Sequence, residues 1–209
     1  DANTTANNNT AIGAGVLTVN TTGANNTSVG AYSLDANTTG DENTAVGYGA
    51  LSANTTASDN TAVGKSALAA NTTGASSTAV GFEAGLAITT GSGHTAFGFS
   101  ALKAATTIDY GFAIGYEAGV ANTSGTQNTF VGNFSGDSVT TGGDNTMVGY
   151  QAGAAVTTGT QNTTYGHRSG DNVTTGNTNT LIGAAVDGSG TSTSNANGLG
   201  YNLSCQDNY

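Results

Sequence analysis

The sequence contains no proline, no tryptophan, one cysteine and only three basic residues among its 209 residues. Because proline cannot donate a backbone hydrogen bond, its absence suits a chain in which nearly every N–H is needed between stacked strands. Lys65, Lys103 and Arg168 stand against 13 acidic residues, which gives a formal net charge of −10. No basic surface is therefore available for phosphate groups, and neither nucleic acid nor an anionic membrane surface is an expected partner.

Cysteine and long apolar runs are equally scarce. Cys205 is the single cysteine, so no internal disulfide can form. No apolar run approaches the roughly 18 residues of a membrane-spanning helix, so we expect no direct membrane insertion. The first ten residues, DANTTANNNT, have no basic or apolar segment and already follow the repeat pattern. We therefore expect no signal peptide here, but a segment of a longer fibre.

Glycine is abundant, with 33 residues, and twelve of these glycines recur at an interval of 17 residues without insertion or deletion. A fixed interval of this size is typical of a solenoid in which each repeat forms one coil. The sequence thus predicts an all-β protein, a parallel β-solenoid (β-roll) of about twelve 17-residue coils, with residues 1–209 as one repetitive domain. We call the twelve residues the marker glycines: Gly13, Gly30, Gly47, Gly64, Gly81, Gly98, Gly115, Gly132, Gly149, Gly166, Gly183 and Gly200.

The residue before each marker glycine is apolar or aromatic, and most are β-branched, as suits a strand. Columns three and six residues after the marker glycine contain mostly small residues. Two short strands per coil, near residues 43–46 and 50–53, would enclose a thin interior, with the marker glycine and a Thr-Thr-Gly segment at the corners. The predicted structural core is the column before the marker glycine: Val46, Val63, Val80, Phe97, Ile114, Val131 and Val148, with the equivalent residues of the other coils.

The repeats change near Gly85. Earlier coils have Leu four residues after the marker glycine and Asn seven residues after it, whereas later coils have Gly and Val at these positions. This pattern predicts an exchange of core volume between the two sides of a corner. Coils so rich in Gly and Ala gain little from burial, and neither end resembles a polar cap. We therefore expect self-association as a homotrimer or filament, with the small-residue columns at the interface.

Several repeats carry a resemblance to known families, namely NTAVGYGALSA, NTAVGKSALAA, STAVGFEAGLA and FAIGYEAGVA. They are similar to the head repeats of trimeric autotransporter adhesins and to NTAxGYxAL-type repeats of phage and bacterial tail fibres. The adhesin heads repeat at about fourteen residues, and this chain repeats at seventeen. The resemblance implies a parallel β-roll of three chains in an extracellular fibre on a cell surface or virion surface, with a host-surface or glycan receptor as a further partner.

A weaker resemblance concerns ice-binding β-rolls, which are also rich in Asn, Thr and Ser and poor in charge. It rests on Asn43, Ala45, Val46 and Gly47, which look like an N-x-V-x-G coil. A column of stacked hydroxyls could order water, contact a glycan, or simply satisfy backbone groups at the corners. Ice binding is therefore the alternative function. The candidate surface-binding column comprises Thr10, Thr27, Thr44, Thr61, Thr78, Thr95, Thr129, Thr146, Thr163 and Thr180.

Aromatic residues follow the marker glycine in half of the coils. Aromatic columns can bind carbohydrate, but rings at coil spacing also stack on one another or pack between chains. His167 and Lys65 interrupt the column. The candidate aromatic column comprises Tyr48, Phe82, Phe99, Tyr116, Tyr150 and Tyr201.

Evidence for metal or catalytic chemistry is sparse. Acidic residues near the corners could hold calcium, although the nine-residue calcium repeat is absent and solvated acids are the alternative. His94 and His167 lie in different columns, Cys205 has no evident base, and no nucleotide or zinc motif occurs. We expect no enzyme, no catalytic residue and no cofactor other than calcium. The calcium candidates are Asp41, Asp59, Asp137, Asp144 and Asp171.

Overall fold

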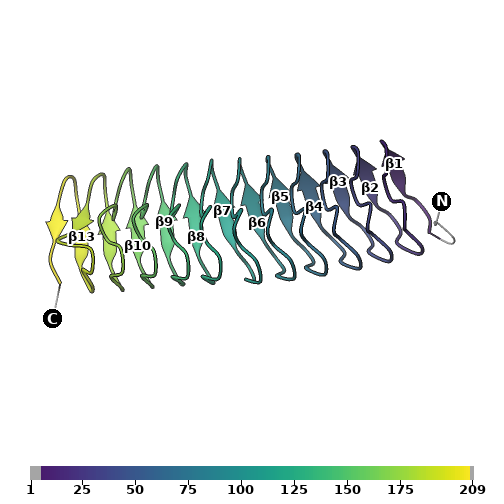
Figure 1. The fold of residues 1–209 in the computed structure, drawn as a ribbon. Helices are drawn as coiled ribbons and strands as arrows, with labels where there is room; N and C mark the ends of the chain where they lie inside the picture. Colours follow the sequence, from purple (N-terminus) through teal and green to yellow (C-terminus); the bar gives the residue numbers. More distant parts are fainter. Residues whose placement is uncertain (1–5, 208–209) are drawn as a thin grey trace.

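The computed structural model describes residues 6–207, which form one continuous parallel β-solenoid (Figure 1). Twelve three-residue strands form a single sheet in the order β1-β2-β3-β4-β5-β6-β7-β8-β9-β10-β11-β13. Each strand pairs with the strand 17 residues away, so that Thr44 lies beside Thr61 and Val46 beside Val63. The predicted fold class, with one coil per repeat, is confirmed. The strands are β1 (Thr10–Ile12), β2 (Thr27–Val29), β3 (Thr44–Val46), β4 (Thr61–Val63), β5 (Thr78–Val80), β6 (Thr95–Phe97), β7 (Phe112–Ile114), β8 (Thr129–Val131), β9 (Thr146–Val148), β10 (Thr163–Tyr165), β11 (Thr180–Ile182) and β13 (Asn197–Leu199).

The predicted second strand near residues 50–53 is wrong, because this segment forms turns. Leu51 has a φ of 51°, in the left-handed region, and an extended strand cannot include that conformation. The turns still bond from coil to coil, as the Leu51 N–H donates to the Ala67 carbonyl at 3.0 Å. Outside the long sheet, the described chain forms one further strand pair, β12 (Asp187–Gly188) with β14 (Ser204–Cys205).

The predicted core column is also wrong, because the buried residue is the middle one in every strand of the long sheet except β1, whose three residues are all exposed. Ala45 is fully buried in β3, whereas Thr44 and Val46 on either side are partly exposed. Successive side chains of a strand point to opposite faces, so the residue before the marker glycine must face outward when the middle one faces inward. The correction applies to Val46, Val63, Val80, Phe97, Ile114, Val131 and Val148, of which Phe97 is 53% exposed.

The actual interior is filled in two ways. In the early coils the small middle residues lie beside fully buried leucines, including Leu34, Leu51 and Leu68. In the later coils glycine replaces leucine and the middle residue grows: a Cβ on Gly119 would lie 2.5 Å from the Phe130 ring. The valines seven residues after the marker glycine are buried as well. Core volume is therefore exchanged as expected, but the incoming bulk is mostly Phe130, Met147 and Leu181.

The marker glycines stand where the backbone turns sharply and touches the next coil. Gly47 has a φ of 135°, and a Cβ at this position would lie 2.5 Å from the Gly64 carbonyl oxygen. A side chain there would be strained in conformation and would clash with backbone rather than with a movable side chain. The strict glycine interval thus follows from the stacking of one coil directly on the next.

Candidate interaction surface

The outward side chains of the long sheet form a continuous surface, which we call the sheet face. It consists of the first and third residues of β1 to β11 and β13. The first residue is Thr in ten strands, and the third is Val, Ile, Leu, Phe or Tyr in all twelve. No charged residue occurs at either position. The sheet face is therefore an uncharged stripe of methyl groups, hydroxyls and rings along the whole solenoid.

The candidate Thr column lies on this sheet face. Within residues 6–207, its hydroxyls make no hydrogen bond to other protein groups, so they are available to solvent or to a partner. The column is not fully regular, because Phe112 and Asn197 replace Thr in β7 and β13. Bulky rings also protrude beside it: Phe97 is 53% exposed and Tyr165 is 58% exposed.

Part of the candidate aromatic column forms a ridge beside the sheet face, in the coils from Phe82 to Tyr150. Phe82 stacks on Phe99 with centroids 5.0 Å apart, and Phe99 stacks on Tyr116 at 4.9 Å. Phe134 then bridges Tyr116 and Tyr150 through edge-to-face contacts. Tyr150 and His167 continue the stack at 5.4 Å.

The sequence did not predict three features of this ridge. Phe134 belongs to the ridge although it lies one position later in its repeat than the other rings do. His167 extends the stack instead of interrupting it. The Lys65 ammonium lies 5.5 Å from the Phe82 centroid and so caps the end of the stack. Because the stacked rings cover one another's faces, the ridge offers mainly ring edges to a ligand, which disfavours sugar stacking. Tyr48 contacts Tyr32 edge to face.

Buried asparagine ladders close the coils at two corners, the first in most coils and the second chiefly in the early ones, and the candidate site residues do not include them. The first lies directly before the strands: the Asn43 amide donates to the Ala57 carbonyl at 2.9 Å, and its oxygen accepts the Asn60 N–H at 3.0 Å. The second lies seven residues after the marker glycine: the Asn54 amide donates to the same Ala57 carbonyl at 3.0 Å and to the Asn37 oxygen at 2.9 Å. Backbone satisfaction at the corners is thus the role of these residues.

The buried asparagines also bear on glycosylation and on the corner threonines. Asn37, Asn54 and Asn71 occur in Asn-Thr-Thr triplets that match a glycosylation signal, yet each is buried with its amide committed to a hydrogen bond. The threonine that follows each of them donates to the next coil, as Thr38 does to the Thr55 carbonyl at 2.9 Å. These hydroxyls, unlike those of the sheet face, have a structural role.

His94 replaces asparagine in the first ladder and is 1% exposed. Its Nδ1 accepts the Gly111 N–H at 3.1 Å, as an asparagine oxygen would, while its Nε2 has no hydrogen-bond partner. Burial lowers the pKa of His94, against opposing effects of Asp109 and nearby carbonyls. Protonation would turn Nδ1 into a donor facing the Gly111 N–H, so the ladder requires the neutral ring.

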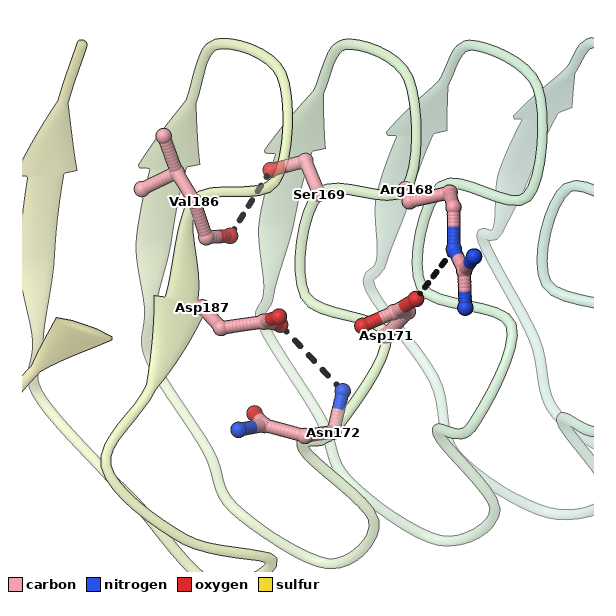
Figure 2. A network of polar contacts seen from close by, with 6 residues as sticks. All are labelled: Arg168, Ser169, Asp171, Asn172, Val186 and Asp187. Atoms are coloured by element: carbon pink, nitrogen blue, oxygen red, sulfur yellow. Dashed lines mark hydrogen bonds and ion pairs between the residues drawn. The ribbon is translucent and has the colours of Figure 1, made fainter. Parts of the chain in front are cut away.

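A carboxylate network lies near the C-terminal end (Figure 2). Arg168 Nε pairs with Asp171 at 2.7 Å, and Asp187 accepts the Asn172 N–H at 3.2 Å from the neighbouring coil. Burial and the adjacent Asp171 carboxyl raise the pKa of Asp187 to about 6. Asp187 therefore takes up a proton under mildly acidic conditions.

The remaining candidate residues do not converge. Within residues 6–207, no group of three His, Cys, Asp or Glu side chains is placed to hold a metal ion. Asp41 accepts the Ala24 N–H at 2.7 Å, and burial raises the pKa of Asp137. Buried His94 and exposed His167 lie in different columns of the coil, and half-buried Cys205 packs against the core near β14. No helix in the described chain could span a membrane.

Comparison with known proteins adds no assignment: no family model, no curated protein and no solved structure matches the chain.

Proposed function

We propose that this chain is a non-catalytic structural segment of an extracellular fibre, which extends and presents a surface as in an adhesin head or stalk or a tail fibre. The observation that carries the proposal is the uncharged sheet face, which runs over all twelve strands of the solenoid. A surface of this kind and length serves contact between long molecules better than recognition of a small ligand.

The architecture suits extension. Twelve coils stacked at about 4.8 Å give a rod about 53 Å long whose stiffness comes from continuous backbone pairing. Both asparagine ladders add side-chain bonds between coils, and every basic residue is engaged, with Lys103 bound to Glu83 at 2.6 Å. The ladder bonds and the Lys103–Glu83 pair hold neighbouring coils together, as a stiff rod requires.

The location on a cell or virion surface, the homotrimeric assembly and a host-surface or glycan receptor rest on the resemblance of the repeats to adhesin heads and tail fibres. Electron microscopy of the purified chain tests the assembly. We expect rods wider than one solenoid, or filaments. Isolated particles with the width of one solenoid would contradict the proposal.

Ice binding is the second candidate, and the outward Thr column favours it. Its hydroxyls are in register from β1 to β6 and from β8 to β11, with the third strand residue alongside. The protruding Phe97 and Tyr165, and Phe112 in place of Thr in β7, argue against it, because a crystal plane demands a flatter and more regular surface than a protein partner does. Thermal hysteresis in a nanolitre osmometer tests this candidate. Measurable hysteresis from a monomer would transfer the proposal to it.

A further inference from the structure

We infer that the sheet face is an interface on which a second copy of this chain binds, sheet face to sheet face along the rod. The inference rests on the proposed function and gives its assembly a contact between pairs of chains, in place of the three-chain packing that the resemblance implies. It also differs from the expected interface of small-residue columns. In the column three residues after the marker glycine, Ala50, Ala67 and Ala84 are fully buried and cannot contact a partner. The column six residues after the marker glycine is only partly exposed and offers little apolar area.

Charge favours this surface over the acidic corners and turns. The chain carries a net charge of −10, so two copies repel each other at long range. Within residues 6–207, the acidic residues lie outside the twelve strands of the long sheet. Two copies can therefore approach on the sheet face without burying unpaired carboxylates, which would be costly.

The dimensions are adequate for a stable contact. Eleven strand spacings make the sheet face about 53 Å long, and a three-residue strand with its side chains and the adjoining ridge is about 12 to 15 Å wide. Each copy would bury about 700 Å², and the pair about 1,400 Å², which lies within the usual range of stable protein interfaces. Exposed apolar side chains, including Ile12, Phe97 and Ile114, supply the apolar part of that area.

Periodicity favours another copy of this chain over an unrelated protein. The outward pair recurs at every strand without a break in register from β1 to β13. A second sheet face has the same spacing, so side chains that fit at one strand fit at the next. The protruding rings at Phe97 and Tyr165 break the regularity that ice would need, but a partner with the same pattern can accommodate them.

Sedimentation velocity over a wide concentration range tests the inference. The variant Val63→Lys with Val80→Lys places two charges on adjacent strands of the sheet face, at partly exposed positions. The control, Thr56→Lys with Thr73→Lys, adds the same charge at exposed corners of adjacent coils. Buried unpaired lysines should weaken the association about a hundredfold or more, whereas the control should associate as the wild type does or more tightly.

The outcomes separate the two claims. If the wild type associates and the Val63→Lys, Val80→Lys variant associates equally well, the interface lies elsewhere, and the inference is overturned while the proposed function stands. If the wild type is a monomer at every concentration, both are overturned. Added salt should strengthen wild-type association, because it screens repulsion between the acidic chains. Circular dichroism verifies that each variant folds. If the lysine variant does not fold, Val63→Thr with Val80→Thr replaces it and should weaken association by a smaller factor.

Discussion

Replacing His94 with asparagine tests the role of the buried ladders through a change in pH dependence. His94 occupies a ladder position where eight other coils carry asparagine. In the variant, we expect the amide oxygen to accept the Gly111 N–H and the amide nitrogen to donate to the Ile108 carbonyl, as Asn43 does to Ala57 in its own coil. Asparagine has no charge to gain in acid, so the variant should lose the acid sensitivity that this position gives the wild type.

The magnitude follows from linkage. An unfolded histidine with a pKa of about 6.5 is stabilised by about 2 kcal/mol through protonation at about pH 5. In the folded chain burial lowers the pKa of His94, so the folded state gains less from acid than the unfolded state does. Stability should therefore fall as pH drops below about 6.5, and this residue should account for up to about 2 kcal/mol of the loss at about pH 5.

Urea denaturation followed by circular dichroism at several pH values measures the effect. The difference in unfolding free energy between His94→Asn and the wild type cancels the titration of all other groups. At neutral pH we expect a small difference, because the new amide bond offsets the volume lost with the ring. The difference should then grow in favour of the variant toward acid. His167→Asn, at an exposed position, is the matched control for the loss of an imidazole. A difference that is independent of pH would refute the reasoning.

Three further predictions concern other parts of the coil. Asp187→Asn should remove a loss of stability that the wild type shows as the pH rises from about 4 to about 6, because an acid with a raised pKa destabilises the fold when it ionises. Solvent screening of this half-buried group limits the gain in unfolding free energy at neutral pH to about 1 kcal/mol. Urea denaturation at both ends of this pH range would disagree with this account if the variant kept the wild-type slope of stability against pH. Gly47→Ala should cost about 3 kcal/mol or more, because of its φ of 135° and its approach to Gly64; a melting temperature within a few degrees of wild type would contradict the stacking described. Asn54→Ala should lower the unfolding free energy by about 2 to 4 kcal/mol, since it leaves a cavity and removes the donor of the buried Asn37 oxygen. Thr56→Ala, at an exposed corner, should cost less than about 0.5 kcal/mol in the same denaturation assay.

The architecture could be predicted from the sequence because its signal, the marker glycines, reports a backbone requirement. Every marker glycine except Gly200, the last, stands where only a residue without Cβ fits against the backbone of the next coil, as at Gly47. An interval that reflects such a requirement appears directly in the sequence, and the coil number and parallel stacking follow from it.

The orientation of the side chains could not be predicted from hydrophobicity. Val46 is more apolar than Ala45, yet Ala45 is the buried residue, because the interior opposite the strand is already occupied by leucine in the early coils. Polarity was no better a guide to the exposed side chains than hydrophobicity was. Asn43 and Asn54 are polar and yet fully buried, since they donate to corner carbonyls that no backbone donor reaches.

The interaction surface follows from that reversal. A valine column placed in the core would leave only hydroxyls and small residues for contact, whereas the same column on the outside gives the sheet face its apolar character. The strongest sequence signal for this arrangement was the alternation within each Thr-x-Val strand, since residues two apart share one face. Leu51 gave no such signal, because its left-handed conformation reflects the geometry of the turn and not a preference of leucine.

Distances between spin labels test most directly whether each 17-residue unit is one rung of a stacked solenoid. In a Cys205→Ser background, cysteines replace Thr44 together with Thr129, Thr146 or Thr163, and labelled chains are diluted with unlabelled ones to remove distances between copies. Double electron–electron resonance should give a narrow distance near 24 Å for the first pair, five strand spacings apart, and about 4.8 Å more for each following pair. Broad distributions, or distances that do not increase by equal steps, would contradict the stacked solenoid.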